Sequence, residues 1–158
     1  MALETSTSQD TSADGFLLAF DGFAQAVRRA RGATAQVRED ALTLSQYALV
    51  QALSGREAAR VQELASEAGI TPSTATRILD ALERRAIVRR ARSLEDRRGV
   101  TVTLTALGRE ALERQDAWLR GRQRAFYAAL PSGERELAPD LLIRLTTLID
   151  ELAAGPDF

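Results

Sequence analysis

The 158-residue sequence contains no cysteine, no histidine and no lysine. Without cysteine or histidine, the chain cannot build a disulfide, a Cys/His zinc site, a thiol redox sensor, a Ser-His-Asp triad or an imidazole proton shuttle. These absences exclude most familiar catalytic chemistry and remove cysteine oxidation as a regulatory trigger. We therefore expect a protein that is not an enzyme and that carries no metal or other cofactor.

Long hydrophobic runs are also missing, and none approaches the ~20 apolar residues that a membrane-spanning helix requires. Residues 1–14 are polar and acidic and lack the basic start of a secretory signal. We expect a soluble, cytoplasmic protein without a membrane partner. Because residues 1–14 offer little apolar surface to bury, the sequence predicts a disordered arm there.

The apolar residues that follow recur every three or four positions, which predicts amphipathic helices. The first runs from Phe16 to about Gly32. A capping box of Thr43 and Gln46 predicts a second helix that stops near Gly55. A third begins near Val61, although the join before it is uncertain by several residues.

The third helix closes at Gly69, which suits the left-handed geometry just past a helix end. Thr71 is then a natural N-cap, and Pro72 occupies a first helical position, where its missing N–H costs nothing. After Arg85 the pattern changes to β-branched alternation, which predicts a two-stranded hairpin with a charged loop at 93–99. The fold class is thus mainly α with a small β-hairpin wing (α+β).

A short helix, a tight turn, a capped helix and a hairpin follow one another in a winged helix-turn-helix, whose second helix enters the DNA major groove. The spacing of these elements alone is equally compatible with simple helix packing, but the distribution of charge favours DNA binding. Between Arg84 and Arg98, seven arginines against two acids give +5, and subtracting this from the net charge of −1 leaves −6 elsewhere. One basic edge on an acidic body suits a polyanion partner, although a solvated charged hairpin would look the same.

The second helix of the motif places its apolar residues on one side and its polar residues on the other. The polar residues on or beside that second face are Ser73, Thr74, Thr76, Arg77, Asp80 and Arg84. Short hydroxyls can approach base edges or phosphates, and the Arg77 guanidinium can bridge two guanine acceptors. Asp80 would repel phosphates, so we expect it to orient Arg77 or Arg84, or to accept from a cytosine amino group. Each residue also has a purely structural explanation as a helix-start or surface residue.

Three stretches of this sequence resemble the MarR family of bacterial transcriptional regulators. They are LTLSQYALVQAL at 42–53, ITPSTATRILDALERRAIVRR at 70–90 and SLEDRRGVTVTLTALGREAL at 93–112. The resemblance implies that Asp96 positions a wing arginine and that Arg98 enters the minor groove, and we include Arg97 among the DNA contacts. A guanidinium suits the narrow, negative groove of A·T-rich DNA, although such a loop also suits a polar turn.

Two residues depart from the family pattern. Ala86 stands where family members commonly carry glycine after the recognition helix, so we expect a strained or altered turn there. Pro139 lies within the last helical pattern, and we expect it to kink that helix or to move its start to about Ala138. Neither residue touches the predicted DNA contacts.

The two C-terminal helices, of which the first is capped by Thr105, carry apolar stripes that require a partner helix. Together with the first helix they exceed what the small winged domain can cover, although an intramolecular bundle would also use them. We assign 42–105 to a winged helix-turn-helix DNA-binding domain, and 15–41 with 106–154 to a helical dimerisation region. The resemblance implies a homodimer with interlocked termini, which would require a pseudo-palindromic operator.

The sequence thus predicts a homodimeric DNA-binding transcriptional regulator, more specifically a repressor released by a small-molecule effector. The family resemblance implies the effector, but no residue identifies its pocket. The rival interpretation is a winged-helix protein-interaction module without sequence-specific DNA binding. An enzyme would depend on carboxylates such as Glu95 and Asp96, which lie in a loop where burial is not expected.

Overall fold

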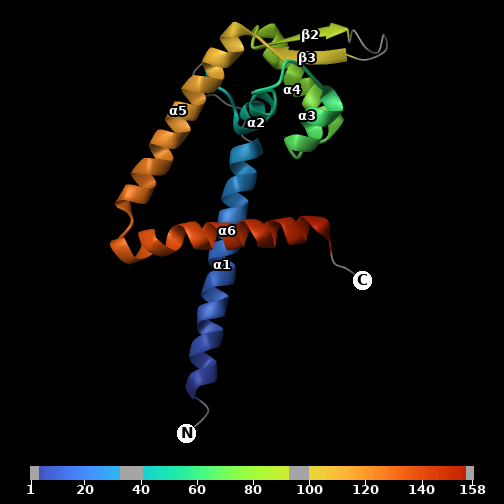
Figure 1. Cartoon of the computed structure of the whole chain (residues 1–158). Coiled ribbons are helices and arrows are strands. Elements are labelled where there is room, and N and C mark those ends of the chain that lie inside the picture. Colours follow the sequence, from blue (N-terminus) through green and yellow to red (C-terminus); the bar gives the residue numbers. More distant parts are fainter. Residues whose placement is uncertain (1–3, 33–40, 93–99, 156–158) are drawn as a thin grey trace. The chain divides into compact units, whose positions relative to one another are not determined.

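The computed structural model describes residues 4–32, 41–92 and 100–155 (Figure 1). These residues fall into two compact units that meet inside one helix, between Gln115 and Asp116. The elements in chain order are α1 (Glu4–Gly32), α2 (Leu44–Ala52), β1 (Ala59–Arg60), α3 (Val61–Glu67), α4 (Pro72–Arg84), β2 (Val88–Arg92), β3 (Val100–Leu104), α5 (Ala106–Ala129) and α6 (Ser132–Ala154). The predicted class, mainly helical with a small sheet, is confirmed.

Residues 41–92 and 100–115 form the winged domain. It contains every residue of the hydrophobic core found among the described residues. Leu49 and Val50 of α2, Leu64 of α3 and Leu79 and Leu82 of α4 are each fully buried. The core therefore fixes the recognition helix α4 by its apolar face.

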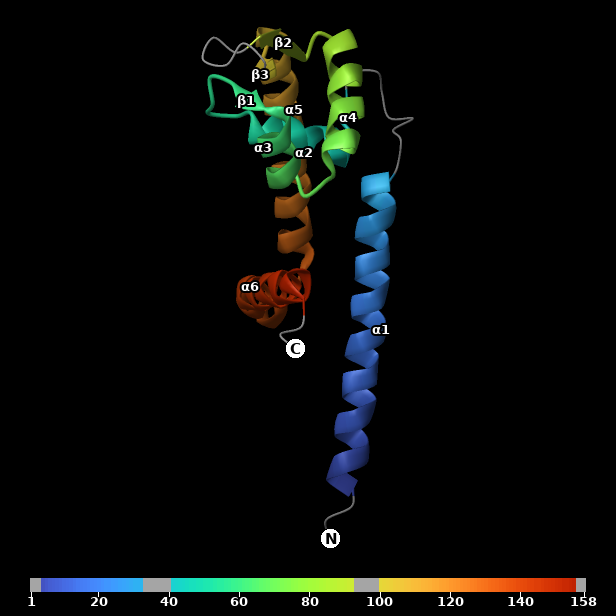
Figure 2. The same cartoon turned by 90° about the vertical axis from the view of Figure 1, so that its right-hand side faces the viewer.

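The wing is a three-stranded antiparallel sheet of order β1-β3-β2, as Figure 2 shows. In this sheet Arg90 of β2 lies opposite Val102 of β3, and Ala59 of β1 pairs with Val102 from the other side. The predicted two-stranded hairpin is therefore present as β2 and β3, but the sheet contains a third strand, β1, that was not predicted. Strand β1 could not be predicted, because two residues are too few to show an alternating pattern.

Threonine side chains cap the starts of α2 and α5, as predicted. Thr43 and Gln46 form the capping box of α2, with both hydrogen bonds at 3.1 Å. The Thr105 hydroxyl accepts from the backbone N–H of Gly108 at 2.9 Å and donates toward the Ala86 carbonyl at 2.7 Å. Thr105 thus joins the start of α5 to the turn that follows α4.

Helices α3 and α4 each end in a turn with the same hydrogen-bond pattern. After α3, Ile70 N–H donates to the Ala65 carbonyl and Gly69 adopts φ +64°. After α4, Ile87 N–H donates to the Leu82 carbonyl in the same pattern, but Ala86 occupies the left-handed position with φ +55°. Ala86 is the single non-glycine residue with positive φ in the described segments. The expected strain at this turn is therefore present, because a Cβ is disfavoured in this conformation.

Helix α1 differs from the sequence expectation at its start. It begins at Glu4, so the prediction of a disordered arm over residues 1–14 is wrong for residues 4–14. The physical reason is cooperativity: once the apolar segment after Phe16 has nucleated a helix, each added residue gains one backbone hydrogen bond without a new nucleus. The predicted end of the helix near Gly32 is confirmed.

Helix α6 begins at Ser132, not near Ala138, and it includes Pro139. The backbone N–H of Arg135 donates to the Pro131 carbonyl at 3.0 Å, so the first turn is already formed before the proline. Pro139, in the helix interior, removes the hydrogen bond that its own N–H would have donated to the Arg135 carbonyl, and its ring crowds that carbonyl. No described helix is long and apolar enough to cross a membrane.

Candidate nucleic-acid interface

Helix α4 separates its residues into a buried face and an exposed face. Ala75, Leu79 and Leu82 are completely buried, while Arg77 and Arg84 lie exposed on the other face. Because these arginines are seven residues apart, they lie on one stripe of the helix. The core therefore holds α4 so that two guanidiniums point into solvent.

The N-terminal turn of α4 is organised by its cap. The Thr71 hydroxyl accepts from the Thr74 backbone N–H at 3.3 Å and also contacts the hydroxyls of Ser73 (3.0 Å) and Thr74 (2.9 Å). Thr74 is half-buried, whereas Ser73 is exposed. Of these two predicted DNA contacts, Ser73 is therefore the more accessible.

Thr76 is exposed, and its hydroxyl donates to the Pro72 carbonyl at 2.9 Å. A hydroxyl oxygen retains acceptor capacity after it has donated its proton. Thr76 is thus placed to accept a hydrogen bond but not to offer one without breaking this contact.

Arg77 and Arg84 have no ion-pair partner among the residues that the structure describes. Free guanidiniums on one exposed stripe offer donors in a fork that fits phosphate oxygens or a guanine edge. Both residues are exposed on the face of α4 that the sequence analysis assigned to DNA, and their contact with DNA stays a prediction.

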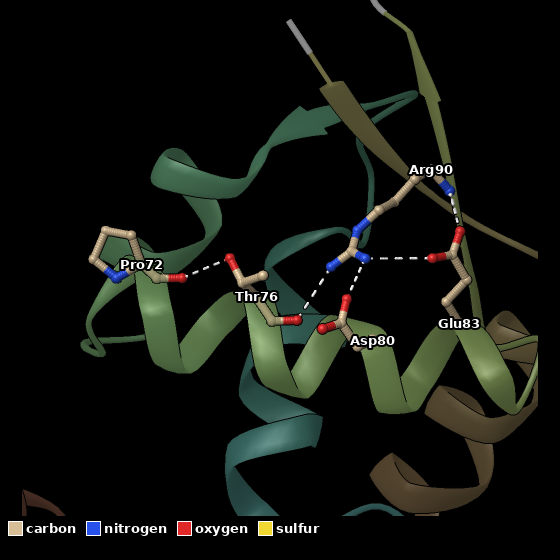
Figure 3. A network of polar contacts seen from close by, with 5 residues as sticks. All are labelled: Pro72, Thr76, Asp80, Glu83 and Arg90. Carbon is tan, nitrogen blue, oxygen red and sulfur yellow. Dashed lines mark hydrogen bonds and ion pairs between the residues drawn. The ribbon is translucent and has the colours of Figure 1, made fainter.

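Asp80 pairs with neither Arg77 nor Arg84. Its carboxylate binds the Arg90 guanidinium from strand β2, as Figure 3 shows. Arg90 also contacts Glu83 at 3.4 Å and donates to the Thr76 carbonyl at 3.1 Å. The expected pairing of Asp80 with Arg77 or Arg84 is wrong because strand β2 supplies a cation beside it, which helical spacing does not reveal. The alternative contact, with a cytosine amino group, stays a prediction.

The basic edge also contains arginines that turn inward. Arg85 donates to the Gln46 side-chain oxygen at 3.3 Å and to the Ala41 carbonyl at 3.2 Å, so it stabilises the start of α2. Arg90 likewise binds within the domain. Of the seven arginines counted in the sequence, these two serve internal contacts, so the charge exposed to a partner is lower than the sequence sum.

The wing strands leave two further arginines exposed, Arg89 and Arg92 of β2. The predicted wing contacts Arg97 and Arg98, together with the positioning residue Asp96, lie outside the described residues. Their predicted roles are therefore untested.

Arg90 is the functional candidate that sequence analysis did not single out. It was counted among the arginines of the edge, but strand alternation already distinguishes it. Val88 is buried, so Arg90, two residues later, faces the same side of the strand, while Arg89 faces away. Period-two alternation predicts that Arg90 points toward α4.

Comparison with known proteins agrees with this geometry. Residues 42–100 match the model of the MarR family. A comparison with curated protein sequences found no match.

Several solved structures are similar to the chain. The MarR family transcription regulator SP03579 is 19% identical, with a TM-score of 0.77 over 94% of this chain and 99% of that one. The transcriptional repressor CouR, bound to a 23-mer DNA duplex, is 28% identical, with a TM-score of 0.67 over 81% and 89%. BpsR of Bordetella bronchiseptica, whose DNA binding is regulated by 6-hydroxynicotinic acid, is 24% identical, with a TM-score of 0.61 over 85% and 98%. Residues 42–100 thus match the model of the MarR family, and their described part has the winged helix-turn-helix fold, as the sequence resemblance indicated.

Proposed function

We propose that this protein is a transcriptional regulator that binds double-stranded DNA as a homodimer. The observation that carries the proposal is the division of α4, whose apolar face is fully buried while Arg77 and Arg84 are exposed and unpaired among the described residues. A helix held in this way presents its side chains to a major groove. The similarity to CouR, solved on a DNA duplex, supports the same use of the fold.

In this proposal Arg77 reads a base, and Arg84 contacts a phosphate. Ser73, Thr74 and Thr76 approach the backbone or base edges at the N-terminal end of α4. As the family resemblance implies, Arg98 of the wing enters the adjacent minor groove, with Asp96 presetting its rotamer, and Arg97 is a further DNA contact. Replacing Arg98 should then weaken binding and reduce the preference for A·T-rich flanks.

Dimerisation is supported by the apolar side chains outside the winged domain. Helix α6 has no buried residue. Its apolar side chains are exposed, with Leu142 at 61% and Leu152 at 63%. On α5, Trp118 and Phe126 are 59% and 70% exposed. Monomeric proteins rarely expose contiguous apolar surface on this scale. A second copy covers such stripes by symmetry and places two recognition helices about 34 Å apart, one DNA turn, on a pseudo-palindromic operator.

We further propose that the regulator is a repressor and that a small organic molecule releases it from DNA. The support is the similarity to CouR, a repressor, and to BpsR, whose DNA binding responds to 6-hydroxynicotinic acid. The proposal involves no catalytic step.

Fluorescence anisotropy with a duplex from the region upstream of the protein's own gene tests DNA binding. If each subunit neutralises about four phosphates, log K against log salt should fall with a slope of about −7 for the dimer. A flat salt response contradicts the proposal.

The second candidate is a winged-helix module that docks its arginines on an acidic protein, and it shares the salt sensitivity. Competition between upstream duplex and unrelated duplex separates the two. A DNA regulator must prefer one sequence, whereas a protein-interaction module binds both duplexes equally or neither.

A further inference from the structure

We propose that Arg90 sequesters both carboxylates of the recognition helix and thereby keeps Arg77 and Arg84 free for DNA. The part of this proposal that concerns DNA affinity rests on the proposed function. The exchange of ion-pair partners within the protein does not, and it is measured separately below.

The sequence of α4 favours a different set of contacts. Its charged residues are two acids, Asp80 and Glu83, and two arginines, Arg77 and Arg84. Asp80 lies three residues after Arg77 and four before Arg84, the spacings at which opposite charges pair on a helix. The order of acid before base at four residues is the more favourable one. An isolated α4 would therefore use Asp80 to occupy a DNA-facing arginine.

The tertiary structure prevents this local pairing. Arg90 lies across the stripe formed by Thr76, Asp80 and Glu83, which are spaced by four and three residues (Figure 3). Its guanidinium binds both carboxylates and the Thr76 carbonyl, and its backbone N–H donates to Glu83 at 3.0 Å. Both acids of α4 are thereby bound to one cation from another element.

Arg90 outcompetes the helix arginines because of its geometry and burial. Its side chain is 22% exposed, whereas the side chains of Asp80 and Glu83 are 44% and 40% exposed. A partly buried guanidinium with several charge-assisted bonds holds a carboxylate better than a flexible exposed side chain does.

Sequestration has two consequences at the interface. The negative charge of α4 is neutralised beside the phosphates that it would otherwise repel. Arg77 and Arg84 keep their donors for base and phosphate contacts, so no ion pair has to be broken when DNA binds. Arg90 is thus a positioning residue that acts through Asp80 and Glu83 without touching DNA.

The exchange of partners can be tested on the protein without DNA. Arginine side-chain NMR spectra are compared for the wild type, Arg90→Gln, and the variant that adds Asp80→Asn and Glu83→Gln to Arg90→Gln. In Arg90→Gln, we expect the Nε–H signals of Arg84 or Arg77 to shift and their exchange with water to slow, because Asp80 has taken a new partner. The triple variant should restore both signals. Unchanged signals in folded Arg90→Gln overturn the proposal.

DNA affinity gives the second readout. Near 0.1 M salt, losing about one phosphate contact per subunit, two per dimer, should lower the affinity of Arg90→Gln about 25- to 100-fold, because for each contact the binding constant varies with close to the inverse first power of the salt concentration. The triple variant should return to within about twofold of the wild type, since the competing carboxylates are gone. A purely mechanical role for Arg90, as a clamp between wing and helix, predicts that the triple variant binds as weakly as Arg90→Gln. That outcome overturns the proposal.

Arg56→Gln is the matched control because it removes an arginine of the same charge from an ion pair outside α4, with Glu67 at 2.5 Å. It should lower affinity by less than about twofold, because no DNA-facing residue changes partner.

If Arg90→Gln does not fold, the double variant Asp80→Asn with Glu83→Gln tests whether the two acids are sequestered by Arg90. Sequestration predicts unchanged Arg77 and Arg84 signals there, whereas a shift shows that the acids were already paired with them. If the wild type binds no duplex, the proposed function fails, and the NMR comparison still tests the ion-pair exchange.

Discussion

Helices α4 and α6 have similar apolar stripes in sequence, but the stripe of α4 is buried and that of α6 is largely exposed. Leu79 and Leu82 of α4 are completely buried, whereas Leu142 and Leu152 of α6 are more than half exposed. A stripe of leucines at helical spacing therefore indicates that a surface must be covered, not which surface covers it. In α4 the cover comes from the same chain, and for α6 we propose that a second copy supplies it.

The largest effect should come from truncating the covered stripe. Leu79→Ala should lower the free energy of unfolding by about 3–5 kcal/mol, because it removes buried methyl groups and leaves a cavity. Leu142→Ala, measured by denaturant unfolding at protein concentrations low enough to dissociate a dimer, should change stability by less than about 0.5 kcal/mol. Equal losses for both variants would remove the distinction between the two helices.

The next effect concerns the exposed stripe. Leu142→Glu with Ile149→Glu should weaken dimer association at least about a hundredfold, because an unpaired charge buried at an interface costs roughly 3 kcal/mol or more. Sedimentation velocity measures the dimer fraction. Thr147→Glu adds a charge to the opposite face of α6 and is expected to leave the dimer intact. If the double variant remains dimeric, α6 does not form the interface.

A smaller effect distinguishes outward from inward arginines. Arg77→Ala should relax discrimination at one base pair per half-site by ~1–3 kcal/mol, which competition between operator variants measures. Arg85→Ala should instead lower stability, because its guanidinium supports the start of α2. Equal weakening on every DNA sequence would make Arg77 a phosphate contact rather than a base-reading residue.

The smallest effect is expected at the turns that end α3 and α4. Ala86→Gly should raise the free energy of unfolding by about 1 kcal/mol, because glycine adopts the left-handed conformation without the Cβ penalty. Gly69→Ala makes the reverse change in the equivalent turn after α3, where φ is +64°, and should lower stability by a similar amount. Thermal unfolding of both variants measures the difference. Opposite signs are expected, and a loss for Ala86→Gly would show that the turn is not strained.

The candidate interface was largely predictable where local rules apply. Thr71 and Pro72 mark the start of α4, and the apolar period assigns its two faces, so Arg77 and Arg84 follow from spacing alone. Local rules failed where another element intervenes. Helical spacing pairs Asp80 with Arg77 or Arg84, and the charge count places Arg85 in the basic edge. Neither rule includes the cation from β2 or the acceptors near α2, because these are distant in sequence.

The sequence by itself determined the order of the helices, their caps, the turn chemistry at Gly69 and the strain expected at Ala86, because each depends on residues within a few positions of one another. Only the tertiary structure decided which arginines are free, because ion pairing depends on which elements the core brings side by side. It also showed that no leucine of α6 is fully buried within the described chain, since burial depends on what packs against a helix rather than on the helix itself.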